Sequence, residues 1–253
     1  MRRTQFLAAL LVFAWGGIAS AAAEIKVLSP GSTEAAFSEL LPQFEKACGQ
    51  TIKIGYGPAG ALAARVAKGE AADVAILGEA QIDELQKQGK LVVGSAAVLT
   101  KVGIGVFVRR GDPKPDIGTV NAFMLSLGRA RTIAYADPKL GGSASILVDD
   151  MLKSLDVTGS IGGRTRLVPP ARPLLDLVAA GGIDFGFNPI PEILSDPRVE
   201  LVGPLPAEIQ RYTRYTAALT TGSSQADGYK ALLGFLSSPA AAAVMKARGF
   251  EAP

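Results

Sequence analysis

The chain has 253 residues, of which 48% are hydrophobic and 19% charged, with 26 Lys and Arg against 23 Asp and Glu. It contains no histidine, so it lacks the commonest general base and the commonest transition-metal ligand. A serine hydrolase with a histidine triad, a cysteine protease and a zinc enzyme are therefore excluded, and we expect neither a metal nor a cofactor.

Residues 1–23 have the pattern of a secretory signal peptide. Arg2 and Arg3 form a basic start, residues 6–18 are apolar but too short to span a bilayer comfortably, and residues 19–23 are small. We predict cleavage after Ala21 or Ala23 and a mature protein in the periplasm.

The mature chain would have 230 residues with 24 basic and 23 acidic side chains, a net charge of about +1. This balance does not suggest a nucleic-acid partner. Cys48 is the only cysteine, so no internal disulfide can form. The core can be large enough for two lobes, and we expect a monomer.

The first half of the mature chain repeats a strand, a small-residue turn and a helix. Phe37 and Phe44 lie on one face of the first predicted helix, as an amphipathic period requires. In chain order, we predict strands at 24–29, 51–56 and 72–77 and helices at 34–47, 61–68 and 81–88.

A long β-rich stretch at 95–109 follows, and then further α/β units. We predict helices at 120–130, 145–155, 174–180 and near Glu192, and strands at 132–137, 166–169, 184–189 and 199–202. A strand at 214–220 would return to the first half, where helices at 226–236 and 239–248 would cover it.

This order predicts an α/β fold of two lobes joined by two crossover strands, with the ligand cleft between the lobes. We assign lobe 1 to residues 24–103 plus 212–253 and lobe 2 to residues 104–211. Tight turns between strands and helices bring several helix N-termini to one sheet edge, where free N–H groups favour an anion.

The turns themselves supply the candidate ligand contacts. Glycines let the backbone approach a ligand closely, and serines either cap a helix or offer a hydroxyl to the ligand. A plain helix cap is the simpler explanation for any single serine, but several such turns at one sheet edge favour a binding site. The candidates are Gly31, Ser32, Ala59, Gly60, Ser143, Ala144, Ser145 and Asn188.

Three charged residues lie near these turns. Arg172 opens a predicted helix and could hold a carboxylate through its two-pronged guanidinium, and Lys139 lies beside the glycine turn. Glu192 could accept a ligand hydroxyl or act as a base. The simpler explanations are solvated surface charges for the two cations and a helix-start carboxylate for Glu192.

Several segments together resemble the periplasmic molybdate-binding protein family, the solute receptors of ABC importers. They occur in order along nearly the whole mature chain: Leu28-Ser29-Pro30-Gly31-Ser32, residues 62–74, Ala136-Asp137-Pro138, Gly186-Phe187-Asn188-Pro189 and Ser238-Pro239-Ala240-Ala241. The resemblance implies a type II periplasmic binding fold, a small anionic ligand and a permease in the inner membrane.

In that family hydroxyls and backbone amides at helix starts hold the oxyanion. The first family serine corresponds to Ser32, the second falls in Pro58-Ala59-Gly60, and the tyrosine falls near Pro189. Two of three hydroxyls are thus replaced, which favours an organic carboxylate over a molybdate-like oxyanion.

An enzyme is the alternative function. Some proteins that resemble this family are periplasmic aconitate isomerases, which move a proton between the cis and trans forms of an allylic tricarboxylate. Such a reaction needs carboxylate contacts and a base of shifted pKa, for which Glu192 and Lys139 are the candidates.

Overall fold

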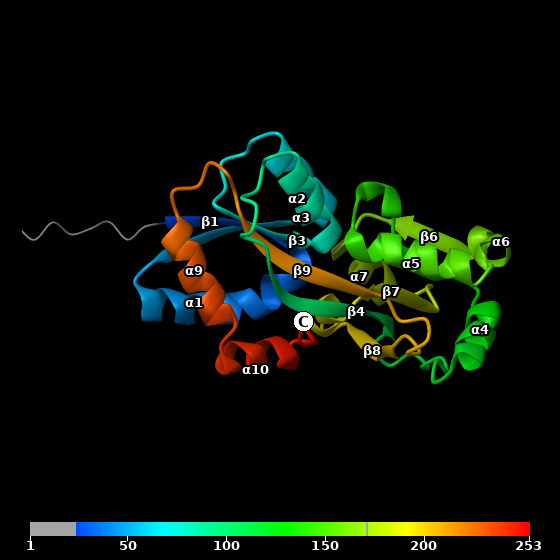
Figure 1. The fold of residues 1–253 in the computed structure, drawn as a ribbon. Coiled ribbons are helices and arrows are strands. Elements are labelled where there is room, and N and C mark those ends of the chain that lie inside the picture. Colours follow the sequence, from blue (N-terminus) through cyan, green and yellow to red (C-terminus); the bar gives the residue numbers. More distant parts are fainter. Residues whose placement is uncertain (1–23, 171) are drawn as a thin grey trace, which may run out of the picture.

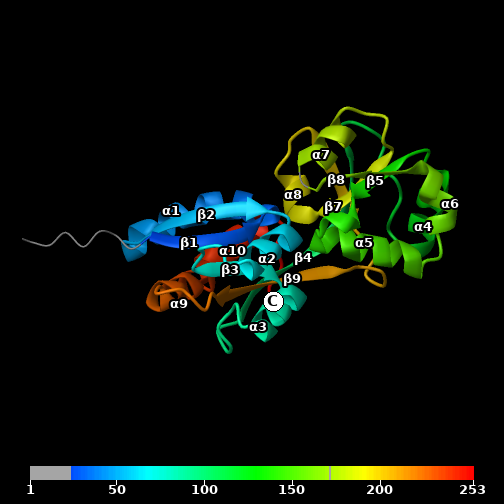
Figure 2. The same cartoon turned by 90° about the horizontal axis from the view of Figure 1, so that it is seen from above.

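The computed structural model describes residues 24–170 and 172–253; the predicted signal peptide at 1–23 lies outside this range. The chain forms two α/β lobes connected by long strands, as Figures 1 and 2 show from two directions. The predicted two-lobed α/β fold is confirmed. The strands are β1 (Glu24–Pro30), β2 (Thr51–Gly57), β3 (Val74–Gly78), β4 (Ala97–Arg109), β5 (Ile133–Ala136), β6 (Thr165–Val168), β7 (Phe185–Pro189), β8 (Val199–Pro204) and β9 (Tyr212–Leu219).

Helices pack against the strands of both lobes. The helices are α1 (Glu34–Cys48), α2 (Ala59–Ala67), α3 (Glu79–Lys87), α4 (Val120–Arg129), α5 (Ser143–Ser154), α6 (Thr158–Ile161), α7 (Arg172–Ala179), α8 (Ile190–Leu194), α9 (Ala226–Leu236) and α10 (Pro239–Ala247). Short 3₁₀ turns are η1 (Gly31–Thr33), η2 (Pro138–Leu140) and η3 (Gly162–Arg164).

Strand β4 belongs to both lobes. Its residues Ala97 to Gly103 pair antiparallel with β9, which also pairs with β3, whereas Ile104 to Arg109 pair with β7 and β8. The change of partner lies between Gly103 and Ile104. One path of strands therefore runs from β2 in the first lobe to β6 in the second.

Parallel pairing brings the turns together in each lobe. β1 pairs in parallel with β2 and β3, and β5 pairs in parallel with β6 and β7. The helix that follows each strand therefore begins at the same sheet edge. The two edges face each other across the space between the lobes (Figure 2).

Each lobe has its own hydrophobic core. In the first, Phe37 and Phe44 of α1 are buried as predicted, and Phe44 packs edge-on against Phe235 of α9. In the second, Phe187 packs edge-on against Phe123 and Phe185. Burial of one such side chain contributes about 1.5–3 kcal/mol, so each lobe can hold its helix starts in place.

Several predicted boundaries were wrong by one or two residues. The helix predicted from residue 145 begins at Ser143, and that predicted from residue 61 begins at Ala59. Helix α6 was not predicted, because Thr-Gly-Ser-Ile has no helical period; it forms because Ile161 is buried in the core of the second lobe.

Cys48 is exposed at the end of α1, and none of the helices within 24–170 and 172–253 is long and apolar enough to cross a membrane.

Candidate functional site between the lobes

A cavity of about 230 Å³ lies between the two lobes. One wall comes from the starts of η1, α1 and α2 in the first lobe, and the other comes from the starts of α5 and α8 in the second. The lining residues are Pro30, Gly31, Glu34, Tyr56, Gly57, Pro58, Ala59, Ala136, Gly142, Ser143, Ala144, Ser145, Val148, Pro170, Phe187, Asn188, Pro189, Glu192 and Tyr215.

The described helix starts around the cavity lack side-chain caps, among them those of α2 in one wall and α5 in the other. Pro58 precedes α2 and Gly142 precedes α5, and in the described chain neither start has a side-chain cap hydrogen bond. Ser145 is buried and its hydroxyl donates to the carbonyl of Gly142 at 2.8 Å. The first amides of α5 thus remain for water or a ligand, and the helix dipole favours a negative charge there.

Tyr215 of β9 lines the cavity together with Gly31 of η1. Its side chain is buried, and its hydroxyl shares a hydrogen bond of 2.8 Å with the hydroxyl of Ser32. Burial raises the pKa of Tyr215, and the nearby Glu192 carboxylate raises it further. The phenol is therefore neutral at any ordinary pH and can donate or accept a hydrogen bond.

Glu192 of α8 is a carboxyl group in the second-lobe wall. Its Oε2 accepts a hydrogen bond of 2.9 Å from Nδ2 of Asn188, which is itself buried. Burial raises the pKa of Glu192 from 4.5 to about 7, although the hydrogen bond from Asn188 acts in the opposite direction. Glu192 can therefore hold or release a proton near neutral pH.

A second carboxylate faces the cavity from the first lobe. Glu34 begins α1, and it lies close enough to Tyr56 to affect that phenol. Burial and then the Glu34 charge raise the pKa of Tyr56 to about 12. The cavity thus has two carboxyl groups and two neutral tyrosines, and among its described lining residues none is Lys or Arg.

The lobes touch each other beside the cavity. The N–H of Gly60 donates to the carbonyl of Gly141 at 2.9 Å, and the Ser143 hydroxyl donates to Oε1 of Gln81 at 3.3 Å. Gln81 also accepts from the N–H of Gly78. These contacts join the start of α2 and the start of α3 to the loop before α5.

Most of the predicted site residues lie at this cavity. Gly31, Ala59, Ser143, Ala144, Ser145, Asn188 and Glu192 line it. Ser32 lies behind Tyr215, and Gly60 uses its N–H for the contact between the lobes. Lys139 and Arg172 are exposed and are not among the lining residues. A role for each of these residues in binding remains a prediction.

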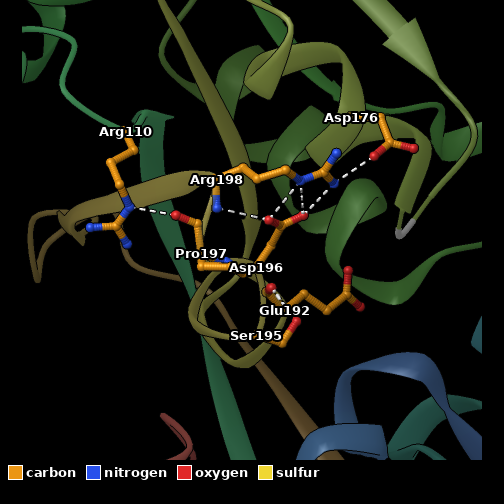
Figure 3. A network of polar contacts seen from close by, with 7 residues as sticks. All are labelled: Arg110, Asp176, Glu192, Ser195, Asp196, Pro197 and Arg198. Atoms are coloured by element: carbon orange, nitrogen blue, oxygen red, sulfur yellow. Dashed lines mark hydrogen bonds and ion pairs between the residues drawn. The ribbon is translucent and has the colours of Figure 1, made fainter.

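Arg172 lies near an ion-pair cluster behind α8. The pKa of Asp196 is lowered mainly because its carboxylate accepts hydrogen bonds from Arg198, and the positive charge of the nearby Arg172 adds a smaller lowering. Arg198 also pairs with Asp176 at 2.6 Å. In Figure 3 the Glu192 carboxylate extends to one side of this cluster and makes no contact with it.

Glu34, Tyr215 and Gln81 are site residues that the sequence patterns do not predict. Glu34 matches an ordinary helix-start carboxylate, and Tyr215 matches an ordinary core residue of a strand. Ser32 and Tyr215 are 183 positions apart, so no local pattern could have joined them. Within the described residues there is also no group of three or more possible metal-ligating side chains.

Comparison with known proteins identifies the family. The family model of the bacterial extracellular solute-binding proteins matches residues 25–251, so the chain belongs to this solute-binding family of ABC transporters. The family implies a periplasmic location, a small anionic ligand and an ABC permease as partner.

Two relatives of different function are similar to this chain over most of its length. The chain is 30% identical over 232 residues to an aconitate isomerase from a Pseudomonas species, covering 90% of this chain and 87% of the relative. It is 25% identical over 241 residues to the molybdate-binding protein ModA of Azotobacter vinelandii, covering 92% and 91%. The solved periplasmic molybdate-binding protein of A. vinelandii superposes with a TM-score of 0.76 at 20% identity, covering 90% of this chain and all but 1% of that one.

Proposed function

We propose that this protein is the periplasmic receptor of an ABC importer and that it binds a small organic carboxylate between its lobes. The observation that carries the proposal is the cavity bounded by uncapped helix starts from the two lobes, α2 on one side and α5 on the other. A carboxylate at the first amides of α5, opposite the start of α2, would join the lobes, and the closed form would dock on the permease.

The rest of the lining favours a ligand with a carbon skeleton. Phe187, Val148 and Ala136 offer apolar surface, which a tetrahedral oxyanion cannot use. The hydroxyl of Ser32 is shared with Tyr215 rather than presented alone. A di- or tricarboxylate could place one carboxylate on the α5 amides and its chain against Phe187.

A thermal-shift screen of the mature protein tests the proposal. Molybdate and sulfate form one arm, and di- and tricarboxylates including cis- and trans-aconitate form the other. A ligand at 100 times its dissociation constant adds about 2.7 kcal/mol to the free energy of unfolding. A shift with carboxylates alone supports the proposal; a shift with molybdate alone would reverse the order of ligands.

A second candidate function is aconitate isomerisation, which Glu192 favours. A carboxyl group with a pKa of about 7 at the cavity wall suits proton transfer at neutral pH, and the Pseudomonas relative is an aconitate isomerase. Glu192 would take a proton from the CH₂ carbon, the double bond would shift, and the proton would return to the far carbon. Because the proton removed from one carbon is returned to another and nothing is oxidised or reduced, the reaction needs no cofactor.

Proton NMR of cis-aconitate with purified mature protein separates the two candidates. A receptor gives no conversion above the buffer control, because tight ground-state binding does not by itself accelerate a reaction. If the trans isomer forms, Glu192→Gln and Lys139→Met identify the base. Loss of turnover in one variant with binding retained would assign that residue.

A further inference from the structure

Glu192 lies in the wall of a cavity whose described charged lining residues are both carboxyl groups, Glu192 itself and Glu34. Helix α8 packs against η1, β4, β7 and β8. From β7, Asn188 donates to the carboxyl group; from β9, the neutral phenol of Tyr215 faces it; from the start of α1, Glu34 faces the same cavity.

Two cations outside the cavity wall have other partners, and Arg172, whose charge acts on Asp196, is exposed and does not line the cavity. On β8, Glu200 pairs with Lys114 at 2.7 Å. Behind α8, Arg198 pairs with Asp196 at 2.6 Å, and the Glu192 carboxylate makes no contact with this pair (Figure 3). An anion in the cavity would therefore meet Glu192 and Glu34 with no cation of the described lining to offset them.

We propose that the anionic ligand binds together with one proton, which Glu192 takes from solvent and holds against the ligand. The neutral carboxyl group then donates its O–H to a ligand oxygen, while its other oxygen keeps the hydrogen bond from Asn188. The site would thus select acids that present one ionised carboxylate to the α5 amides and an acceptor oxygen to α8. This inference rests on the proposed function.

Burial supports the assignment of the proton to Glu192. Because the wall around it raises its pKa to about 7, protonation is inexpensive at neutral pH, and a bound anion would raise the pKa further by like-charge repulsion. Above pH 7 each pH unit should weaken the affinity about tenfold, since a proton must be taken up with the ligand. Ligand carboxyl groups with an ordinary pKa of about 4 stay ionised throughout this range.

Calorimetric titration with trans-aconitate at pH 6, 7, 8 and 9 tests the proposal. At each pH two buffers of different ionisation enthalpy report directly how many protons accompany binding. We expect close to one proton per ligand at pH 8 in the unmodified protein, a result that needs no variant. Glu192→Gln should bind with nearly constant affinity from pH 6 to 9, because its amide supplies a permanent donor.

Glu34→Gln is the matched control, because Glu34 is the other carboxylate of the lining. It should keep the tenfold slope, whatever its effect on affinity. A slope lost in Glu34→Gln but kept in Glu192→Gln, or binding without proton uptake, would overturn the inference and leave the proposed receptor function intact. If neither trans-aconitate nor any carboxylate of the thermal-shift panel binds at any pH, the proposed function itself fails.

Discussion

The backbone N–H of Gly60 donates a hydrogen bond of 2.9 Å to the carbonyl oxygen of Gly141, across the boundary between the lobes. Both residues are glycine for a physical reason. A Cβ on Gly60 would lie 2.6 Å from that oxygen, and Gly141 has a φ of +75°, which side chains rarely adopt. The pair therefore joins the start of α2 in the first lobe to the loop before α5 in the second.

Gly60→Ala should therefore weaken ligand binding by about tenfold or more, because the methyl group holds the lobes apart and overpacking of this kind costs about 1–3 kcal/mol. We expect the ligand-free protein to tolerate the methyl group by separation of its lobes, and alanine favours the α2 helix. Calorimetric titration measures the loss of affinity, and the radius of gyration from X-ray scattering measures the separation of the lobes.

Gly234→Ala is the control for that experiment. Gly234 lies in α9, and a Cβ there would meet no atom within 4 Å. Its affinity should match that of the unmodified protein, and its stability should rise slightly. Equal affinities for all three proteins would show that the Gly60 contact does not control closure.

Ser32→Ala and Tyr215→Phe should each destabilise the protein by about 1–3 kcal/mol, because each leaves one buried hydroxyl without its partner. The double variant should cost less than the sum of the two, since it removes both groups of the pair together. Urea unfolding of the four proteins measures the coupling energy. Strict additivity would mean that the two hydroxyls do not depend on each other.

The fold could be predicted from the sequence further than the site could. The alternation of strand, turn and helix fixes which turns share a sheet edge, so Gly31, Ala59 and the turn from Ser143 to Ser145 were found at the cavity. Contacts between distant segments leave no local trace. The role of Gly60 depends on the approach of Gly141, and that of Ser32 depends on Tyr215.

The positions of charged side chains were harder to predict from the sequence than the positions of the turns. A helix-start residue points toward or away from a cleft according to the rotation of its helix, which the sequence leaves undetermined. Glu34 and Arg172 both begin helices, yet Glu34 lines the cavity and Arg172 does not.

Arg172→Ala tests the predicted carboxylate contact of that residue. Since Arg172 is exposed and lies near Asp196 rather than in the cavity wall, we expect less than a twofold change in affinity for any carboxylate that the thermal-shift panel identifies. Lys139→Ala serves as a second exposed cation and should behave alike. A loss of about 1.5–3 kcal/mol in Arg172→Ala alone, the range for a hydrogen bond to a charged group, would establish Arg172 as a ligand contact.

The stability of the ligand-free protein should fall as the pH rises from about 4.5 to about 7, through Glu192. In this window the folded protein keeps the Glu192 proton, because burial raises its pKa to about 7, whereas the unfolded chain has already released it. The folded state then binds more protons than the unfolded state, so increasing pH favours unfolding, by at most roughly 3 kcal/mol over the window. Carboxyl groups with lowered pKa values, such as Asp184 and Asp196, act in the opposite direction at lower pH.

The difference in unfolding free energy between the unmodified protein and Glu192→Gln isolates the Glu192 contribution, and Glu34→Gln controls for loss of a cavity carboxylate. Parallel stability curves for the unmodified protein and Glu192→Gln from pH 4.5 to 8 would show that Glu192 titrates as an ordinary surface carboxylate.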